Sequence, residues 1–431
     1  MKPQLIIGAT SSGCGKTTFT MGLLRVLSRR GLRVQPYKCG PDYIDTQFHS
    51  LASGQVSVNL DTWLASEKHV VSLYRSYGSD SDVCVVEGVM GLYDGHSRMK
   101  GSSAEIAALL DLPVVLLVNA RSMAYSVAPL IEGFVRFSSK VRITGVVFNQ
   151  VSSVSHYQYL KEACQDIGIV CLGYMPYTKK VEVPSRHLGL SLGTRKRMEN
   201  QIEQTAELIE QYVDVDRLLE ICTKPFVAEE KRDDRQGNLK IAMANDAAFN
   251  FVYRENVEQL RRLGEVVCFS PLNGDVLPKA DLVYLPGGYP ELFAYRLKKQ
   301  RKLMGELFEY AENGGRILAE CGGMIYLSRS ITNRQGDKSY QMAGILPLNC
   351  TMQEAKLHLG YRKMGEGENE WKGHEFHYSK MIHAQNIPSI TMQQNAKGQD
   401  VQTALYRYKN VIAGYTHWYW GEKNILDLWN L

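Results

Sequence analysis

The chain has 431 residues, of which 44% are hydrophobic and 22% charged, and its formal net charge is +5. A chain of this length is expected to form about two to four domains. Its composition excludes a largely disordered chain, a collagen-like chain and a coiled coil. The small net charge does not indicate a dedicated nucleic-acid binder, so no nucleic-acid partner is expected.

The sequence also carries signals about its cellular location. A membrane-spanning helix needs about 20 apolar residues, and the longest apolar run near a predicted strand, residues 112–118, is far shorter. The N-terminal residues turn polar too early for a signal peptide. The nine cysteines are scattered and contain no C-x-x-C pair. We therefore expect reduced thiols in a cytoplasmic protein that does not enter a membrane.

In the first half of the chain, short runs rich in Val and Ile alternate with helical patterns. The runs cover residues 5–9, 83–87, 114–119 and 143–149, and the helical patterns between them include residues 16–30 and 103–110. Near-continuous apolar runs are typical of buried parallel strands with helices on both faces. This half is predicted to be a doubly wound α/β domain.

Residues 222–238 interrupt this alternation. The segment holds a proline, the charged run EEKRDDR and a glycine, a composition typical of an interdomain linker, although an exposed loop within one domain is the alternative. The strand pattern returns at residues 239–244, 266–270, 281–286 and 316–321. We therefore expect two α/β domains, residues 1–221 and 239–431, joined by residues 222–238.

A phosphate-binding loop is predicted directly after the first strand. The strand runs into GATSSGCGKTT and then into a helical pattern. Gly13 and Gly15 would let backbone N–H groups surround phosphate oxygens at a helix N-terminus. Lys16 would reach the β- and γ-phosphates, and the Thr17 hydroxyl would help to hold Mg²⁺. Thr10 stands where the usual motif has its first glycine, a variant that resembles the loop of dethiobiotin synthetase-like enzymes.

Two acidic segments are expected beside this loop. Asp45 lies in CGPDYIDT, and Glu87 ends the predicted strand at residues 83–87. A carboxylate at the carboxyl end of a neighbouring strand is placed to bind Mg²⁺ or to orient a reacting group. Asp42 and Asp94 are further candidates, and for each of these four acids the alternative is a helix cap or a surface carboxylate.

The second half contains a candidate nucleophile. In RILAECGGM a predicted strand ends at Cys321, two glycines follow, and a helical pattern begins. This is the pattern of a nucleophile elbow, in which the helix N-terminus lowers the thiol pKa. The alternative is a buried structural cysteine. His417 in GYTHWYW is the first candidate for the base, and His374 and His377 in GHEFHYS are others. The turn at Gly287 and Gly288 would supply an oxyanion hole.

Eight motifs in this order resemble those of the cobyrinic acid a,c-diamide synthases, over nearly the whole chain. The motifs are GATSSGCGKTT, KCGPDYID, EGVMGLYDG and SRHLGL, followed by LPGGYPE, ECGGMIYL, GHEFHYS and GYTHWYW. The resemblance implies an ATP- and Mg²⁺-dependent synthetase domain with a P-loop NTPase-type sheet, similar to dethiobiotin synthetase. It also implies a C-terminal class I glutaminase domain.

The resemblance assigns roles to individual residues. It implies that Cys321 is the nucleophile, His417 the base and Gly288 part of the oxyanion hole. In the synthetase domain it implies that Gly13, Gly15, Lys16 and Thr17 bind the phosphates. It implies a metal site formed by Thr17, Asp45 and Glu87. The implied substrate site consists of Tyr43, Asp45 and Asp94. One departure concerns the His-x-Glu pair of class I glutaminases, because Trp418 and Tyr419 follow His417 here. The site is then a Cys–His dyad, or another group such as Glu375 orients the histidine.

The implied reaction is the ATP-dependent amidation of the a- and c-carboxylates of cobyrinic acid, with glutamine as nitrogen donor, in cobalamin biosynthesis. Cobyric acid synthases are close alternatives, but they tend to have Tyr-x-His-Gly where this chain has Thr416-His417-Trp418. A nickel sirohydrochlorin a,c-diamide synthase would use the same motifs. A partition-type ATPase switch shares the variant loop but has no use for a glutaminase. A homodimer is left open.

Overall fold

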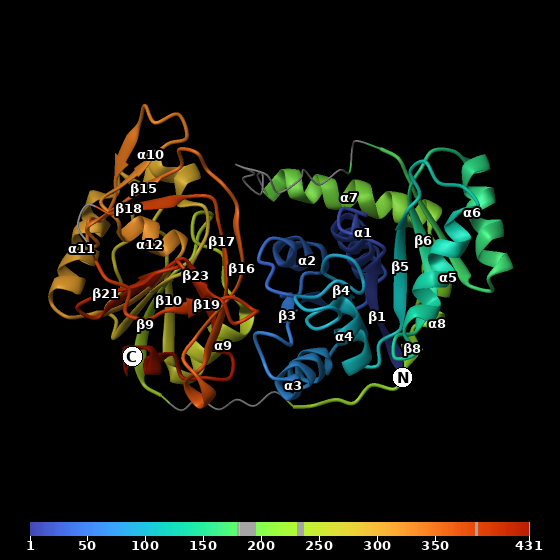
Figure 1. Ribbon diagram of the computed structural model, residues 1–431, viewed down its shortest axis with the longest axis horizontal. Helices are drawn as coiled ribbons and strands as arrows, with labels where there is room; N and C mark the ends of the chain where they lie inside the picture. Colours follow the sequence, from blue (N-terminus) through green and yellow to red (C-terminus); the bar gives the residue numbers. More distant parts are fainter. Residues whose placement is uncertain (179–180, 182–194, 231–236, 384–386, 431) are drawn as a thin grey trace. The chain divides into compact units, whose positions relative to one another are not determined.

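The structure is a computed structural model that describes residues 1–178, 181, 195–230, 237–383 and 387–430. The chain divides into two compact units between residues 232 and 233. Figure 1 shows both units in sequence colours. The SRHLGL motif, at residues 185–190, lies outside the described residues, and so does the part of the expected linker at residues 231–236.

The first unit is built on a sheet in the order β3-β2-β4-β1-β5-β6-β7, with all of these neighbours parallel. A short strand, β8 (Thr223–Lys224), pairs antiparallel with the beginning of β1. The seven parallel strands are β1 (Lys2–Ala9), β2 (Val34–Cys39), β3 (Val58–Leu60), β4 (Val83–Glu87), β5 (Val114–Asn119), β6 (Ile143–Val151) and β7 (Val170–Pro176). Crossovers between parallel strands place the connecting helices on the faces of the sheet.

The helices of this unit follow the βα alternation that the sequence predicts. They are α1 (Lys16–Arg29), α2 (Asp45–Ser53), α3 (Glu67–Gly78), α4 (Ser103–Leu109), α5 (Val127–Phe137), α6 (Val154–Asp166), α7 (Arg195–Tyr212) and α8 (Val215–Ile221). Buried residues of α1, α7 and α8 form one cluster with residues of β1, β4 and β5. Helix α7 lies along α1 (Figure 1), and Gly22 permits this approach, since a Cβ there would lie 2.6 Å from Thr205 Cγ2.

Residues 223–230 of the expected linker pack on the first unit. Besides the β8 pairing, the Phe226 ring lies 6.0 Å from that of Tyr74, and the Ser72 hydroxyl donates to the Glu229 carboxylate over 2.5 Å. The domain limits derived from composition remain a prediction.

The second unit contains three sheets in the part that the structure describes. The main sheet has the order β10-β9-β11-β12-β22-β21, parallel except for the edge strand β21. Its strands are β9 (Leu239–Ala244), β10 (Gly264–Phe269), β11 (Leu282–Leu285), β12 (Arg316–Glu320), β21 (Leu405–Tyr408) and β22 (Val411–Gly414). The predicted α/β class is confirmed, and the sheet is mixed rather than wholly parallel.

Two smaller sheets complete this unit. One has the order β20-β19-β16-β17-β23 and the other β14-β13-β15-β18. Their strands are β13 (Ser330–Thr332), β14 (Ser339–Gln341), β15 (Leu348–Thr351), β16 (His358–Met364), β17 (Trp371–His377), β18 (Lys380–His383), β19 (Gln393–Gln394), β20 (Asp400–Val401) and β23 (Thr416–Tyr419). The strand-like GHEFHYS segment forms much of β17. The other strands are short or partly exposed and lack a continuous apolar run, so apolar patterning did not reveal them.

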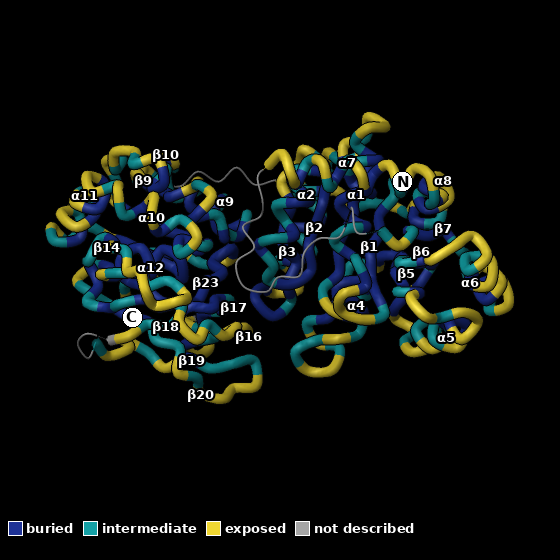
Figure 2. The backbone as a smooth tube through the Cα atoms, turned by 90° about the horizontal axis from the view of Figure 1, so that it is seen from above, coloured by how far each residue is buried: buried dark blue, intermediate teal, exposed yellow. Residues whose placement is uncertain are grey.

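Helices and core residues lie on both faces of the main sheet. The helical segments are α9 (Arg254–Leu263), η2 (Pro290–Phe293), α10 (Ala294–Leu297), α11 (Arg301–Glu312), α12 (Gly322–Leu327), η3 (Gly367–Asn369) and η4 (Ile425–Asn430). One buried cluster joins the sheet to α11, α12 and the four-stranded sheet, and a second joins it to α9 and the five-stranded sheet. The central strands are accordingly the darkest part of each unit in Figure 2.

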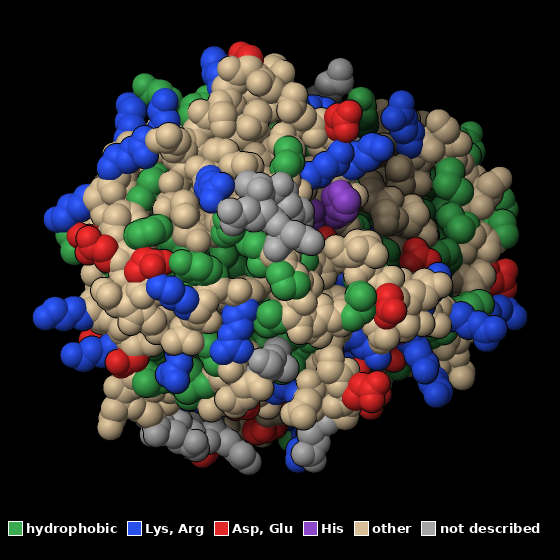
Figure 3. Space-filling model, turned by 60° about the vertical axis from the view of Figure 1, so that its left-hand side comes forward, with side chains coloured by type: hydrophobic (Ala, Val, Ile, Leu, Met, Phe, Trp, Pro, Cys, Tyr) green, Lys and Arg blue, Asp and Glu red, His purple; other side chains and the backbone are tan. Residues whose placement is uncertain are grey.

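Two observations concern the expectations about membranes and charge. None of the described helices is long and apolar enough to cross a membrane. Basic and acidic side chains are interspersed over the face seen in Figure 3.

Candidate active sites in the two units

The loop between β1 and α1 has the backbone that a phosphate loop needs. Gly13 and Gly15 have φ angles of 76° and 91°, in the left-handed region that glycine tolerates. At Gly15 a Cβ would also overlap the Asn149 amide, which donates to Cys14 O over 2.7 Å. Among the described residues no side chain caps α1, and its first turn holds no acid. The helix N-terminus is therefore open to an anion.

The two residues that follow the loop point toward the neighbouring strand β4 and the loop after it. The Lys16 ammonium donates to the backbone oxygen of Met90. Burial, and then the positive charge of Lys38, lower the pKa of Lys16. The Thr17 hydroxyl donates to Glu87 Oε1 over 2.8 Å. The structure thus brings Lys16, Thr17 and Glu87 together, as the sequence predicts.

A buried lysine joins the two predicted acidic positions. Lys38 Nζ lies 2.8 Å from both Asp45 Oδ2 and Glu87 Oε1. His49 Nε2 lies 2.5 Å from Glu87 Oε2. Burial opposes ionisation of Glu87, but the charges of Lys38 and His49 outweigh it, so its pKa is lowered. Lys38, His49 and the two carboxylates, all buried, form one connected site at the carboxyl ends of β2 and β4.

Lys38 and His49 were not identified from the sequence as site residues, although a sequence feature points to each of them. Lys38 stands in the KCGPDYID motif at the end of a buried strand, where a lysine has no packing role. His49 lies four residues after Asp45 in α2, which places both side chains on one face of the helix.

The other predicted residues of this unit lie outside that cluster. Asp42 Oδ1 accepts from the N–H groups of Ile44 and Asp45, both over 2.9 Å, as a helix cap does. Asp94 is exposed, and its Oδ2 accepts from Gly91 N over 3.1 Å. Tyr43 is buried, with 4% of its surface exposed. A substrate role for Tyr43 and Asp94 remains a prediction.

In the second unit, Cys321 stands at a strained turn between β12 and α12. Its φ and ψ are 45° and −100°, a conformation that non-glycine residues rarely adopt and that is common at functional sites. Its N–H donates to Gly414 O over 2.7 Å, and its Sγ lies 3.7 Å from Phe376 O. At Gly323 a Cβ would overlap Leu285 O. This is the geometry of the predicted elbow.

The Gly287–Gly288 turn lies between the elbow and His417. A Cβ at Gly287 would overlap the His417 ring, and one at Gly322 would lie 2.9 Å from Gly288 N. Gly288 has φ 152° and lies against Ala248 O. The structure therefore brings Cys321, Gly288 and His417 into one site, with His417 on β23 of the five-stranded sheet.

The thiol and the imidazole are both neutral in this environment. Burial, followed by the charge of Glu291, raises the pKa of Cys321 well above its ordinary 9.0, although the Gly322 N–H acts in the opposite direction. Burial, followed by the charges of His374 and His377, lowers the pKa of His417 to about 3. The pair is thus not a preformed thiolate and imidazolium.

Glu375 is not placed to orient His417. In the antiparallel pairing of β17 with β23, His374 stands opposite His417, whereas Glu375 stands opposite Thr416. Opposed residues share a face of the sheet and successive residues alternate, so Glu375 and His417 point to opposite faces. The Glu375 carboxylate instead contacts His377 at 2.7 Å, Arg362 at 2.5 Å and Thr403 at 2.7 Å.

Another carboxylate, which sequence reasoning missed, connects the strands of the nucleophile and the histidine. Glu320 accepts from Trp418 N over 2.9 Å and from the Tyr284 hydroxyl over 2.8 Å. Burial raises its pKa to about 8. Its position directly before Cys321 was the available signal.

Comparison with known families agrees with this division into two sites. Residues 5–190 match the CobQ/CobB/MinD/ParA nucleotide binding domain, and residues 240–425 match the CobB/CobQ-like glutamine amidotransferase domain. Fold and sites therefore define a glutamine amidotransferase fused to a nucleotide-binding domain.

Relatives that match nearly the whole chain identify the family within this class of proteins. The cobyrinate a,c-diamide synthase of Caldanaerobacter subterraneus subsp. tengcongensis is 38% identical, over 96% of this chain and 94% of the relative. The cobyrinate a,c-diamide synthase of Picrophilus torridus is 38% identical, over 96% of this chain and 95% of the relative. The hydrogenobyrinate a,c-diamide synthase of Brucella anthropi is 39% identical, over 96% and 97%. This chain belongs to the cobyrinate a,c-diamide synthase family.

Proposed function

We propose that this protein uses ATP and glutamine to amidate the a- and c-carboxylates of cobyrinate in cobalamin biosynthesis. The observation that carries the proposal is the presence of two separate buried sites in one chain of this family. One is the Lys16–Lys38 cluster behind the phosphate loop, and the other is the Cys321 elbow with its Gly287–Gly288 turn.

The first site is suited to activating a carboxylate. A carboxylate is a poor acyl donor, and transfer of the γ-phosphoryl group of ATP converts it to an acyl phosphate that ammonia can attack. Catalysis of such a transfer consists largely of positioning and charge neutralisation. Lys16 and Lys38 supply positive charge, and the open N-terminus of α1 supplies backbone N–H groups.

The oxygen atoms in this site also fit Mg²⁺, which prefers hard oxygen ligands. Thr17, Asp45 and Glu87 would hold the ion, sharing the two carboxylates with Lys38. When bound, Mg²⁺ would neutralise charge on the phosphate oxygens.

The second site is suited to releasing ammonia from glutamine. Sγ of Cys321 attacks the carboxamide carbon, and His417 accepts the thiol proton. The N–H groups of Gly288 and Gly322 stabilise the oxyanion. The C–N bond then breaks, the proton passes from His417 to the leaving nitrogen, and a γ-glutamyl thioester remains. Water activated by His417 hydrolyses the thioester to glutamate. Because both groups are neutral at rest, proton transfer accompanies the attack.

The decisive experiment is a mass spectrum of the product. We expect cobyrinate, ATP, Mg²⁺ and glutamine to give a product with two amides, and Cys321→Ala to give it only with ammonia. Hydrogenobyrinate is a second substrate to assay, since relatives named for it are equally similar, and nickel sirohydrochlorin is a third. If the protein amidates neither cobyrinate nor hydrogenobyrinate, the proposal is overturned.

A further inference from the structure

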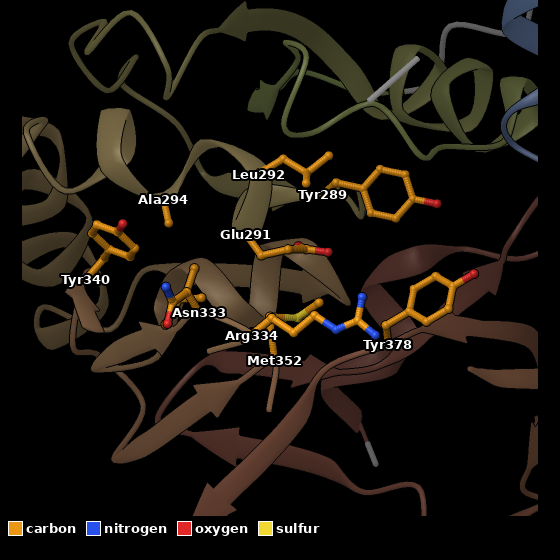
Figure 4. Close-up of a pocket in the computed structure, with 10 residues that line it drawn as sticks. Tyr289, Glu291, Leu292, Ala294, Asn333, Arg334, Tyr340, Met352 and Tyr378 are labelled. Atoms are coloured by element: carbon orange, nitrogen blue, oxygen red, sulfur yellow. The ribbon is translucent and has the colours of Figure 1, made fainter. Parts of the chain in front are cut away.

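A small cavity in the second unit is lined in part by segments that adjoin the elbow of Cys321. Its volume is about 160 Å³, below the roughly 300–1,000 Å³ of sites for drug-sized ligands. Figure 4 shows its lining, which includes Tyr289 and Glu291 from the segment after the Gly287–Gly288 turn, Arg334 after β13, and Tyr378 after β17. The size suits a single amino acid.

Two of the segments that line the cavity also contact the elbow. Pro290, directly before Glu291, has its Cδ 2.9 Å from where a Cβ on Gly322 would stand. Phe376 O, which contacts Cys321 Sγ at 3.7 Å, lies two residues before Tyr378. The charge of Glu291 is close enough to raise the pKa of the Cys321 thiol. A ligand in the cavity would therefore lie close to the elbow that carries Cys321.

The cavity holds one acidic and one basic side chain that do not pair with each other. Glu291 Oε2 is buried and has no hydrogen-bond partner among the described residues. Arg334 is exposed, and no ion pair of its guanidinium is found in the described ranges. In Figure 4 both side chains extend toward the side of the cavity where Tyr289 and Tyr378 lie.

Such an arrangement is costly without a ligand. A buried carboxylate oxygen without a donor loses its hydration and gains nothing in return. In agreement with this, burial raises the pKa of Glu291 to about 7. A ligand that presents an ammonium group to Glu291 and a carboxylate to Arg334 would satisfy both charges. These are the two charged groups of a free α-amino acid.

We propose that Glu291 binds the α-ammonium and Arg334 the α-carboxylate of the L-glutamine whose carboxamide reaches Cys321. Both are specificity-determining residues, and the assignment rests on the proposed glutaminase function. It has one consequence for the chemistry. The substrate ammonium neutralises Glu291, and so removes a charge that holds the thiol in its protonated form.

The test compares L-glutamine with glutaramate, which is glutamine without its α-amino group. The variant Glu291→Gln keeps the size of the side chain and removes its charge. A hydrogen bond between charged groups predicts a loss of about tenfold or more in kcat/KM for L-glutamine, expressed mainly in KM. The same variant should cause no loss in kcat/KM for glutaramate, which has no ammonium group to pair with Glu291, so the preference for L-glutamine falls by at least that factor. Glu309→Gln, on the exposed side of α11, is the matched control and should keep the preference.

The second arm uses Arg334→Gln and 4-aminobutanamide, which lacks the α-carboxylate. We expect the variant to lose activity on L-glutamine but not on this analogue. The activity that each variant retains on the analogue lacking the matching group reports that the second unit is folded. An unchanged preference in Glu291→Gln, or an equal loss on glutamine and glutaramate, would overturn the assignment. Failure of the proposed function would look different, because Cys321→Ala would then keep its glutaminase activity.

Discussion

The carboxylate of Glu320 accepts a hydrogen bond from the backbone N–H of Trp418 over 2.9 Å. It thereby links the end of β12, where Cys321 follows, to β23, which carries His417. The Tyr284 hydroxyl donates to the other oxygen over 2.8 Å. One side chain thus fixes the spacing between two strands of different sheets.

Replacing this carboxylate should impair the glutaminase reaction alone. Glu320→Ala leaves the buried Trp418 N–H and Tyr284 hydroxyl without an acceptor, at a cost of about 1–3 kcal/mol for each group. We expect a lower thermal unfolding midpoint and a reduced kcat for glutamine hydrolysis, with ammonia-dependent amidation retained. Glu320→Gln keeps an acceptor for Trp418 and is the control. Equal activity of the Ala and Gln variants would contradict the link.

The same residue predicts a pH dependence of stability. Its pKa is raised from 4.5 to about 8 in the folded protein, so between these values the folded state binds more protons than the unfolded state. Its contribution is fully present below pH 4.5 and is lost as the pH rises through about 8. Chemical denaturation across this window should therefore show the wild type losing stability relative to Glu320→Gln. A difference that does not change with pH would reject the raised pKa.

In the first unit, Lys38→Met should abolish amidation with either nitrogen source. The variant removes the cation between Asp45 and Glu87, and uncompensated buried carboxylates cost about 3–5 kcal/mol. Lys16→Ala should abolish amidation too, with a smaller loss of stability, because Lys16 forms no such ion pair in the described chain. Glutamine hydrolysis measured without a corrinoid should persist in both variants. If a variant retains amidation, the lysine that it replaces has no role in the amidation site.

Glycines at the Gly287–Gly288 turn should not tolerate alanine. At Gly287 the added methyl group would displace the His417 ring, and at Gly288 it would meet Ala248 O. We expect Gly287→Ala to lower glutaminase kcat by about tenfold or more, the loss seen when an oriented base is misplaced. Gly305 in α11 has nothing within 4 Å of such a Cβ. Gly305→Ala is thus the matched control, and its effect should be neutral or stabilising by about 0.5–1 kcal/mol.

Metal removal should separate the two reactions. EDTA is expected to stop ATP-dependent amidation, because Thr17, Asp45 and Glu87 would supply the oxygen ligands that Mg²⁺ prefers. Glutamine hydrolysis at Cys321 needs no metal in the scheme above and should continue. Added Mg²⁺ should restore amidation. Loss of both reactions with EDTA would argue against this separation.

Local sequence patterns determined much of the fold. Strands β4, β5 and β9 have the bounds that their apolar runs predict, because a strand covered on both faces needs a continuous apolar run. The phosphate loop and the elbow were also visible, since each depends on glycines adjacent in sequence to the reactive residue. The family resemblance supplied the rest of the predicted site.

The tertiary structure decided the contacts between distant segments. Lys38 meets Glu87, and Glu320 meets Trp418, because strands far apart in sequence are neighbours in a sheet or lie across two sheets. Glu375 lies away from His417 because the register of β17 and β23 sets which face each side chain takes. Glu291 and Arg334 likewise line one cavity only after folding. Motifs identify the reactive residues, whereas register and packing determine which groups surround them.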